Sequence, residues 1–274
     1  MTFYAPQRMI AVCSIIAACG ILSSCALIKQ PPQQKEVLPE VSRLVPEILD
    51  VYSFDPNSFT QGLEFDKKDH TLIVGTGMQG ESRLYRRTLS GTELQSVSNT
   101  PEIFGEGITQ VRDIIWQLTW KNGVAFSYDA NTLAPIATVP YDREGWGICA
   151  AEPGQVITSD GSAKLQVRED LNLNPIKEIT VHREGQEISG LNELECLDGL
   201  IYANIFPTSE IVIINQETGE VRATIDASNI PNNAPPDINN VLNGIAAVPG
   251  ESGNFLIAGK RWPDIYKVRF RPAD

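Results

Sequence analysis

The residues best suited to chemistry stand at the heads of five short runs that resemble one another. In the clearest run, residues 104–108, a carboxylate stands between two glycines at the start of an apolar segment. A carboxylate can carry a proton, and an amide N–H can donate a hydrogen bond to developing negative charge. The run heads supply one acid, three amides and one aromatic ring, at Glu106, Gln61, Asn192, Asn243 and Trp146.

The five runs recur at intervals that are typical of a β-propeller. Their heads are 45, 40, 46 and 51 positions apart. Each run is followed by a turn and further β-rich segments, but the fifth repeat ends at Phe270 without a fourth strand, which residues 46–54 could supply. We therefore predict an all-β fold, a five-bladed β-propeller over residues 45–274 whose last blade is closed by an N-terminal strand. A β-sandwich of similar strand count does not account for five equivalent repeats.

A second set of residues is expected beside the run heads. In a propeller blade the innermost strand lines the central channel, and the second strand runs antiparallel to it. The end of each second strand therefore lies next to the head of the first strand, at one mouth of the channel. The residues at these second positions are Gly77, Trp120, Asp160, Phe206 and Lys260.

Most of these residues also have a purely structural interpretation. Lys260 could be solvated, and Asp160 could serve its own turn, because Asp-Gly suits turns. Glu106 is harder to explain in this way, because burying a carboxylate without hydrogen-bond partners costs on the order of several kcal/mol. Aromatic residues most often fill a core, which could be the role of Trp120, Trp146 and Phe206.

The glycines on either side of Glu106 predict a close approach of the backbone. Gly105 and Gly107 have no side chain to keep a neighbour away. We expect them to let the backbone pass close to a substrate, with Lys260 as the neighbour that sets the charge state of Glu106.

The composition describes a folded, acidic chain. Of the 274 residues, 42% are hydrophobic, which is enough for one large domain with a sizeable core. Lys and Arg total 22 against 34 Asp and Glu, and the formal net charge is −12. This sign argues against nucleic acid or an anionic lipid surface as a partner.

Residues 1–24 have the features of a lipoprotein signal peptide. Arg8 precedes an apolar stretch, residues 9–22, and the following Ser-Ser-Cys25 resembles the bacterial lipobox, whose cysteine is acylated. The stretch is shorter than the ~18 residues of a membrane-spanning helix. We expect an exported lipoprotein facing the bacterial periplasm or the cell exterior, with residues 25–44 as lipidated Cys25 and tether, and with membrane contact through the lipid anchor only. A soluble secreted form is the alternative.

Two cysteines, Cys149 and Cys196, remain available for a disulfide bond. Export favours such a bond. However, the two residues stand one position out of register in their repeats, and strand alternation would turn them to opposite faces. The register therefore argues against the disulfide.

Other chemistries find little support. The two histidines, His70 and His182, are 112 positions apart at unrelated points of the repeat, so no zinc-binding spacing exists. No serine or cysteine nucleophile has a visible base, and Gly-Thr-Gly at residues 75–77 is too short for a phosphate loop. We expect no metal and no cofactor at the site, and the sequence leaves a structural cation in the channel open.

Eight successive motifs begin at Phe59, Phe104, Gln117, Gly145, Ser159, Leu191, Leu242 and Gly259. Together they resemble the plant-type and bacterial glutaminyl-peptide cyclotransferases over residues 45–270, in order and without a large gap. Members of this family are five-bladed propellers that convert the N-terminal glutamine of a peptide into pyroglutamate with release of ammonia. The resemblance implies that this chain acts on peptides or proteins with N-terminal glutamine, without the zinc of the unrelated animal enzymes.

The resemblance also implies roles for individual residues. It makes Glu106 the general acid/base, while Gln61, Asn192 and Lys260 would orient the substrate amide and stabilise developing charge. Burial would raise the pKa of Glu106 and Lys260 would lower it, so the net direction stays open. The residues expected to bind substrate are Phe59, Phe104, Trp120, Trp146, Asp160, Phe206 and Asn243.

One position departs from the family, and two other functions remain as alternatives. Phe206 stands where the family usually has tryptophan, which keeps an apolar wall but lacks the indole N–H, so rate or substrate preference could differ. The chain could instead be a non-catalytic propeller that binds or scaffolds proteins of the cell envelope. A calcium-dependent lactonase-type propeller would need more carboxylates at the channel mouth than Glu106 and Asp160. Retention of Glu106 and Lys260 favours the enzyme, which we expect to be a monomer.

Overall fold

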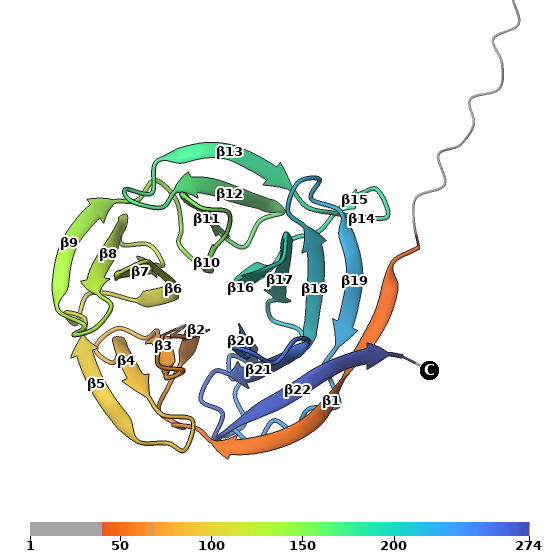
Figure 1. Cartoon of the computed structure of the whole chain (residues 1–274), viewed down its shortest axis with the longest axis horizontal. Helices are drawn as coiled ribbons and strands as arrows, with labels where there is room; N and C mark the ends of the chain where they lie inside the picture. The colour runs from red at the N-terminus through yellow and green to blue at the C-terminus, as the bar shows by residue number, and fades with distance from the viewer. Residues whose placement is uncertain (1–39, 67, 274) are drawn as a thin grey trace, which may run out of the picture. The chain divides into compact units, whose positions relative to one another are not determined.

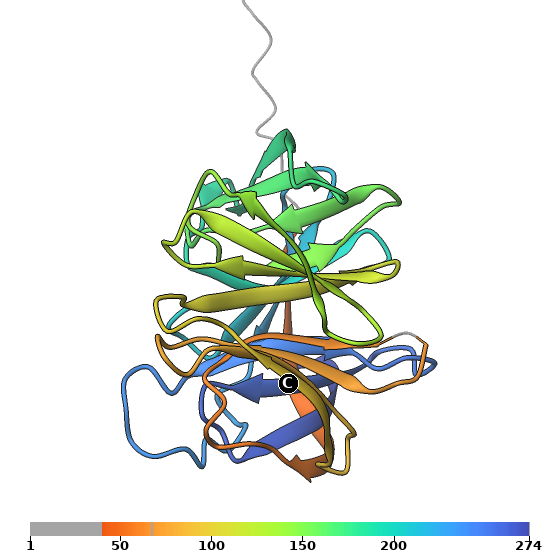
Figure 2. The ribbon, with the colours of Figure 1, turned by 90° about the vertical axis from the view of Figure 1, so that its left-hand side faces the viewer.

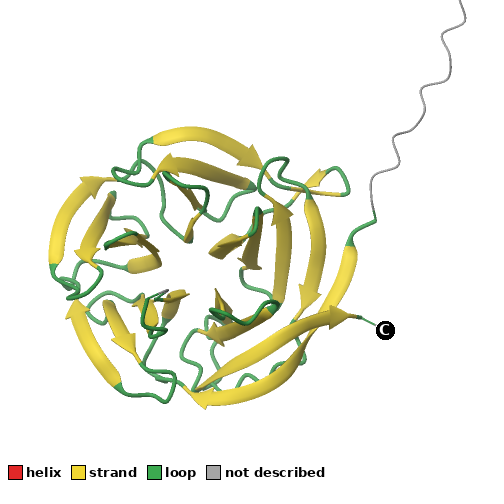
Figure 3. Ribbon diagram, viewed as in Figure 1, coloured by secondary structure: helices red, strands yellow, loops and turns green. Residues whose placement is uncertain are grey.

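The structure is a computed structural model that describes residues 40–66 and 68–273. In that part of the chain, all regular secondary structure consists of β-strands (Figure 3), so the all-β prediction is confirmed. Among the described residues, no helix has the length and apolar character needed to cross a bilayer. The predicted signal peptide and Cys25 lie outside these residues. The first strand, β1 (Ser42–Ser53), includes residues 42–44 of the segment predicted as tether.

Three sheets contain four antiparallel strands each, in chain order. The first consists of β2 (Thr60–Phe65), β3 (Leu72–Thr76), β4 (Arg83–Arg87) and β5 (Glu93–Ser98). The second consists of β6 (Gly105–Val111), β7 (Ile114–Thr119), β8 (Val124–Asp129) and β9 (Pro135–Pro140). The third consists of β10 (Ile148–Ala150), β11 (Gln155–Thr158), β12 (Lys164–Glu169) and β13 (Pro175–Thr180).

A further sheet has eight strands in the order β16-β17-β18-β19-β1-β22-β21-β20. β1 pairs antiparallel with β22, as expected for the N-terminal strand, and residues 42–44 also pair in parallel with β19. The N-terminal strand therefore joins the last two repeats into one sheet. Its other strands are β16 (Leu191–Leu197), β17 (Leu200–Ile205), β18 (Glu210–Asn215), β19 (Val221–Asp226), β20 (Leu242–Ala247), β21 (Asn254–Gly259) and β22 (Asp264–Pro272), and a separate hairpin contains β14 (His182–Arg183) and β15 (Gln186–Glu187).

The sheets are arranged around a common centre, with β2, β6, β10, β16 and β20 nearest to it (Figure 1). Figure 2 shows the twist between the strands of each sheet. Burial decreases from the centre outward: β2 and β3 are buried throughout, whereas the outer strands β5 and β9 are mostly exposed. The inner strands nevertheless carry polar residues, and buried polar residues require a specific explanation.

The core lies between neighbouring sheets. The described residues form five apolar clusters, each of which joins the facing sides of adjacent sheets or sheet halves. One cluster joins the two halves of the eight-stranded sheet and packs Ile211 and Ile225 against Ile245 and Ile257. The two halves therefore face each other as separate layers do.

Cys149 on β10 and Cys196 on β16 form a disulfide bond, with their Cα atoms 5.5 Å apart. The sequence argument against this bond was wrong. It compared the two residues within their own repeats, whereas neighbouring sheets pack opposite faces against each other. A residue on the forward face of one sheet therefore meets a residue on the backward face of the next. Both cysteines contact the apolar cluster between these two sheets.

Candidate active site

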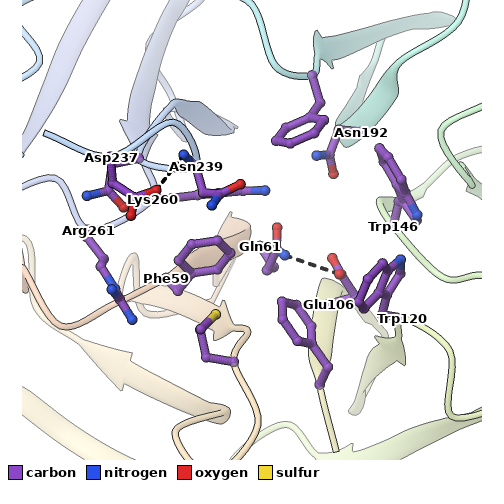
Figure 4. A pocket seen from close by; sticks show the side chains of 14 residues that line it. Phe59, Gln61, Glu106, Trp120, Trp146, Asn192, Asp237, Asn239, Lys260 and Arg261 are labelled. Carbon is purple, nitrogen blue, oxygen red and sulfur yellow. Dashed lines mark hydrogen bonds between the residues drawn. The ribbon is translucent and has the colours of Figure 1, made fainter.

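A cavity of about 330 Å³ opens where the inner strands begin (Figure 4). Side chains from several sheets line it, and most of these residues belong to the sequence motifs. Nine residues predicted for the site line this cavity: Phe59, Gln61, Phe104, Glu106, Trp120, Trp146, Asn192, Phe206 and Lys260.

Irregularities in the pairing of the inner strands coincide with their polar residues. The register of strand pairing shifts by one residue in each of β2, β6, β16 and β20, directly at the run heads. A β-bulge of this kind leaves an extra residue unpaired and can redirect its side chain. The first residues within the four shifts are Gln61, Glu106, Asn192 and Asn243, and the last three are followed there by Gly107, Glu193 and Gly244.

Glu106 on β6 is a buried acid that lines the cavity. Its Oε1 accepts a hydrogen bond of 3.1 Å from Gln61 Nε2. Burial raises the pKa of Glu106 well above its usual range, Lys260 opposes this shift, and Glu144 adds to it. The direction that the sequence left open is therefore upward, because desolvation outweighs the attraction of the ammonium.

A second hydrogen bond determines how Gln61 faces Glu106. Asn243 is fully buried behind Gln61, and its Nδ2 donates to Thr60 O at 3.0 Å and to Gln61 Oε1 at 2.9 Å. A backbone carbonyl can only accept, so Asn243 must present its N–H groups on this side. Gln61 Oε1 is then the acceptor, and Gln61 Nε2 must face Glu106. Asn243 consequently orients a cavity residue and does not itself line the cavity.

Lys260 follows β21 and is buried between two aromatic rings. Its Nζ lies 5.0 Å from the ring centroid of Phe59 and 4.5 Å from that of Phe206. Burial lowers the pKa of Lys260 to about 8, and Glu106 opposes that shift. Among residues 40–66 and 68–273, no side-chain acceptor forms a hydrogen bond or ion pair with this ammonium. Its donors are available to a ligand in the cavity.

Asn192 brings a second amide to the cavity from β16. Its own carbonyl accepts a 2.6 Å hydrogen bond from Ser159 Oγ, and Ser159 Oγ in turn accepts one of 2.7 Å from Gly147 N. These contacts hold the backbone of Asn192 against the neighbouring sheet. Its Oδ1 is buried without a hydrogen-bond partner among the described residues, as expected at a site that takes a polar ligand.

Two tryptophans form one wall of the cavity, and Glu144 holds both of them. Its Oε2 accepts hydrogen bonds from Trp120 Nε1 at 2.9 Å and from Trp146 Nε1 at 3.3 Å. Phe104 packs against Trp120 with ring centroids 5.5 Å apart. The ring of Phe206 stands at right angles to Trp146, 5.8 Å away. This wall offers flat apolar surface for the methylene groups of a ligand.

Asp160 does not line the cavity. Its Oδ1 accepts hydrogen bonds from Ser162 N and Ser162 Oγ, and its Oδ2 pairs with Arg143 at 3.1 Å. These contacts match the turn role that the Asp-Gly pair also allowed.

The glycines beside Glu106 serve neighbouring strands instead of a substrate. A Cβ at Gly107 would lie 2.5 Å from Trp146 O, and one at Gly105 would lie 2.6 Å from Thr76 O. Gly107 N also donates to Trp146 O at 2.7 Å. The expectation that these glycines admit a substrate was therefore wrong. They let the inner strands approach each other closely enough to place Glu106 at the cavity.

The sequence analysis missed several cavity residues. Met78 follows the first sheet's second strand, and the loop between β19 and β20 supplies three more polar side chains. No repeat pattern marks this loop, so the sequence offered no signal for it. The residues that were missed are Met78, Asp237, Asn239, Asn240 and Arg261.

Glu193, next to Asn192, is a second fully buried acid that was missed. Its Oε1 accepts from Leu63 N at 3.2 Å and its Oε2 from Ile245 N at 2.8 Å. Burial raises the pKa of Glu193 well above its usual range. This carboxyl group ties β16 to β2 and β20, the strands that carry Gln61 and Asn243.

Comparisons with known proteins identify the family. A sequence model described as glutamine cyclotransferase matches residues 18–270. The glutaminyl-peptide cyclotransferase of Arabidopsis thaliana is 28% identical over 234 residues, which cover 83% of this chain and 72% of the plant protein. The crystal structure of Myxococcus xanthus glutaminyl cyclase matches with a TM-score of 0.80 and 33% identity, over 86% of this chain and 100% of that chain. The resemblance seen in the sequence is confirmed, and the chain belongs to the glutamine cyclotransferase family.

Proposed function

We propose that this enzyme cyclises the N-terminal glutamine of peptides or proteins to pyroglutamate and releases ammonia, with Glu106 as the proton shuttle. The proposal rests chiefly on one feature, the buried carboxyl group of Glu106 that faces the cavity with Gln61 Nε2 on its Oε1. Buried acids with a raised pKa suit proton transfer near neutral pH.

The reaction needs no protein nucleophile, because the attacking and attacked groups belong to one residue of the substrate. The neutral α-amine attacks the side-chain amide carbon, a C–N bond forms, and the amide oxygen becomes an oxyanion. Glu106 accepts a proton from the attacking nitrogen and gives it to the departing nitrogen. The original amide C–N bond then breaks, and ammonia leaves.

Three groups would stabilise the oxyanion. Gln61 has a second N–H on Nε2 beyond the one that it donates to Glu106, Asn192 brings an amide to the same cavity, and Lys260 brings a positive charge that forms no hydrogen bond or ion pair with the described residues. Such preorganised donors in a dry site contribute on the order of 3 kcal/mol each. Trp120 and Trp146 would hold the substrate's methylene groups.

We also propose that the fold is a five-bladed propeller. In this interpretation β16 to β19 form the fourth blade and β20, β21, β22 and β1 form the fifth. The five apolar clusters support it, since each would fill one interface between successive blades. The inner strands also contact one another around the ring, including β2 with β20.

The export and lipidation of Cys25 remain proposals from the sequence, as do the monomeric state and the absence of a metal or cofactor. Within the described residues, no three His, Cys, Asp or Glu side chains are grouped to hold a metal ion. Palmitate labelling in a bacterial host tests the anchor. We expect label on the wild type and none on Cys25→Ala.

An assay for two products tests the function. The purified protein is incubated with a Gln-initiated peptide, with and without a chelator, while ammonia is measured and the peptide is weighed by mass spectrometry. We expect ammonia and a peptide lighter by one NH₃ in equal amounts, and no effect of the chelator. If the peptide binds but neither product forms, the chain is a binding or scaffolding propeller. Loss of activity in chelator would contradict the metal-independent proposal.

A further inference from the structure

One side of the cavity is polar and is not used by the cyclisation. Asp237, Asn239 and Arg261 lie on the side of Gln61 opposite Trp120 and Trp146 (Figure 4). A peptide substrate continues beyond its first residue, and its backbone N–H and C=O groups need hydrogen-bond partners wherever they leave water. The tryptophan wall offers flat apolar surface, whereas the opposite side offers both donors and acceptors.

Asp237 and Asn239 lie on one loop, which hydrogen bonds hold in place, whereas Arg261 follows β21. The loop connects β19 to β20, and Asn240 within it is buried. Asn240 Nδ2 donates to Pro235 O at 2.8 Å, Asn232 Nδ2 donates to Asn240 O at 2.8 Å, and Trp262 Nε1 donates to the same carbonyl at 3.2 Å. The loop is therefore a fixed rim, and a preorganised rim loses little entropy when a ligand binds.

The charged residues on this side of the cavity differ in whether they form an ion pair. Arg261 pairs with Glu81 at 3.3 Å, and Lys260 is buried between Phe59 and Phe206. Asp237 is exposed, and it forms no ion pair with any residue in the described ranges. Its Oδ1 accepts a 2.7 Å hydrogen bond from Asn239 N, which holds the carboxylate at the rim. The formal charge of the whole chain, −12, adds a field of the same sign.

We propose that this rim is the subsite for the residues that follow the substrate's N-terminal glutamine, and that Asp237 selects a cationic side chain there. Asn239 and Arg261 contact the peptide backbone, and Asp237 pairs with a lysine or arginine of the substrate. The inference rests on the proposed cyclisation and deepens it by assigning a preferred class of peptide.

Four substrates test the inference: glutamine amide, which lacks a second residue, and Gln-Lys, Gln-Ala and Gln-Glu peptides of equal length. The variant is Asp237→Asn, and the matched control is Asp198→Asn, an exposed aspartate that lines a different pocket, with Glu195 and Glu251. We expect wild type and control to favour Gln-Lys over Gln-Ala in kcat/KM by about two- to fivefold, the range of an exposed ion pair. Added salt should reduce this preference.

In Asp237→Asn, the ratio of kcat/KM for Gln-Lys over Gln-Ala should fall towards one, and the rate on glutamine amide should fall less than the rate on Gln-Lys. Equal rates of the wild type on all peptides, or an equal loss on glutamine amide and on the peptides in the variant, would overturn the subsite. These results differ from failure of the proposed function, in which the wild type releases ammonia from none of the four substrates and both proposals fall.

Discussion

Asn243 Nδ2 donates a hydrogen bond of 2.9 Å to Gln61 Oε1, and this contact fixes the direction of the hydrogen bond from Gln61 to Glu106. The direction follows from Thr60 O, a backbone carbonyl that can only accept the hydrogen bond from Asn243 Nδ2. A buried amide that does not line the cavity therefore decides that the carboxyl group of Glu106 faces a donor.

Asn243→Asp tests this relationship. The new carboxylate would accept a hydrogen bond from Gln61 Nε2, so Gln61 would turn its Oε1 towards Glu106. Glu106 would then lose the hydrogen bond that stabilises its charged form. The pKa of Glu106 should rise further, and kcat should fall about tenfold or more, as expected for a hydrogen bond to a charged group. The acid limb of kcat against pH measures this shift, because kcat reports groups in the enzyme–substrate complex. Asn243→Leu is the control without a carboxylate. A lower kcat with an unmoved acid limb in Asn243→Asp would mean that Asn243 serves only packing.

Lys260 predicts the alkaline limb of activity. Its pKa is lowered to about 8, so the ammonium is present below that pH and is lost above it. If the ammonium stabilises the oxyanion, kcat/KM should fall as the pH rises through about 8. The substrate amine becomes more reactive as it loses its proton. A fall in kcat/KM in this pH range therefore reports the titration of a group on the enzyme. In Lys260→Arg the limb should disappear, since a guanidinium stays charged. A limb of unchanged position in that variant would assign it to another group.

Phe206 should affect the same limb through its contact with Lys260. Tryptophan is a better cation–π partner than phenylalanine, so Phe206→Trp should favour the charged form of Lys260. We expect the alkaline limb to move up by as much as about one pH unit. Phe206→Leu removes the ring and should move it down. Equal limbs in all three proteins would show that the ring contact at 4.5 Å has no electrostatic effect.

Glu193 links stability to pH. Its folded pKa is raised, so the neutral form is favoured on folding. The stability from this group is fully present below its unfolded pKa and is lost as the pH rises through the folded pKa. In Glu193→Gln, an NH₂ group would face the backbone N–H of Leu63 or Ile245 and cost about 1–3 kcal/mol. Urea unfolding at several pH values should show a lower free energy of unfolding and a weaker pH dependence. An unchanged pH dependence would assign the effect to Glu106, the other buried carboxyl group with a raised pKa in the part of the chain that the structure describes.

The sequence predicted the all-β fold and most of the cavity lining, but not the loop between β19 and β20. The five run heads are readable because each inner strand carries the same short run, and Glu106 is conspicuous as a carboxylate among apolar residues. The bulges at Gln61, Glu106, Asn192 and Asn243 were not foreseen, since register depends on the partner strand. For the same reason the disulfide of Cys149 and Cys196 was judged from one repeat at a time.

The remaining errors concern contacts that only the folded chain creates. Asn243 looks like Asn192 in the sequence, but it lies behind Gln61 instead of at the cavity. Gly107 lies against the backbone of β10, a strand far away in sequence. The loop with Asp237 has no counterpart in the other repeats, so periodicity could not place it.

The most direct test of the account is single-turnover ammonia release by Glu106→Gln. Glutamine keeps the size of the side chain and can face Gln61, but it cannot carry the proton. General acid/base catalysis contributes about 10²- to 10⁴-fold, so release should slow by at least about a hundredfold while the Kd for a Gln-initiated peptide stays near the wild-type value. Release at the wild-type rate in this variant would contradict the assignment of Glu106 as the proton shuttle.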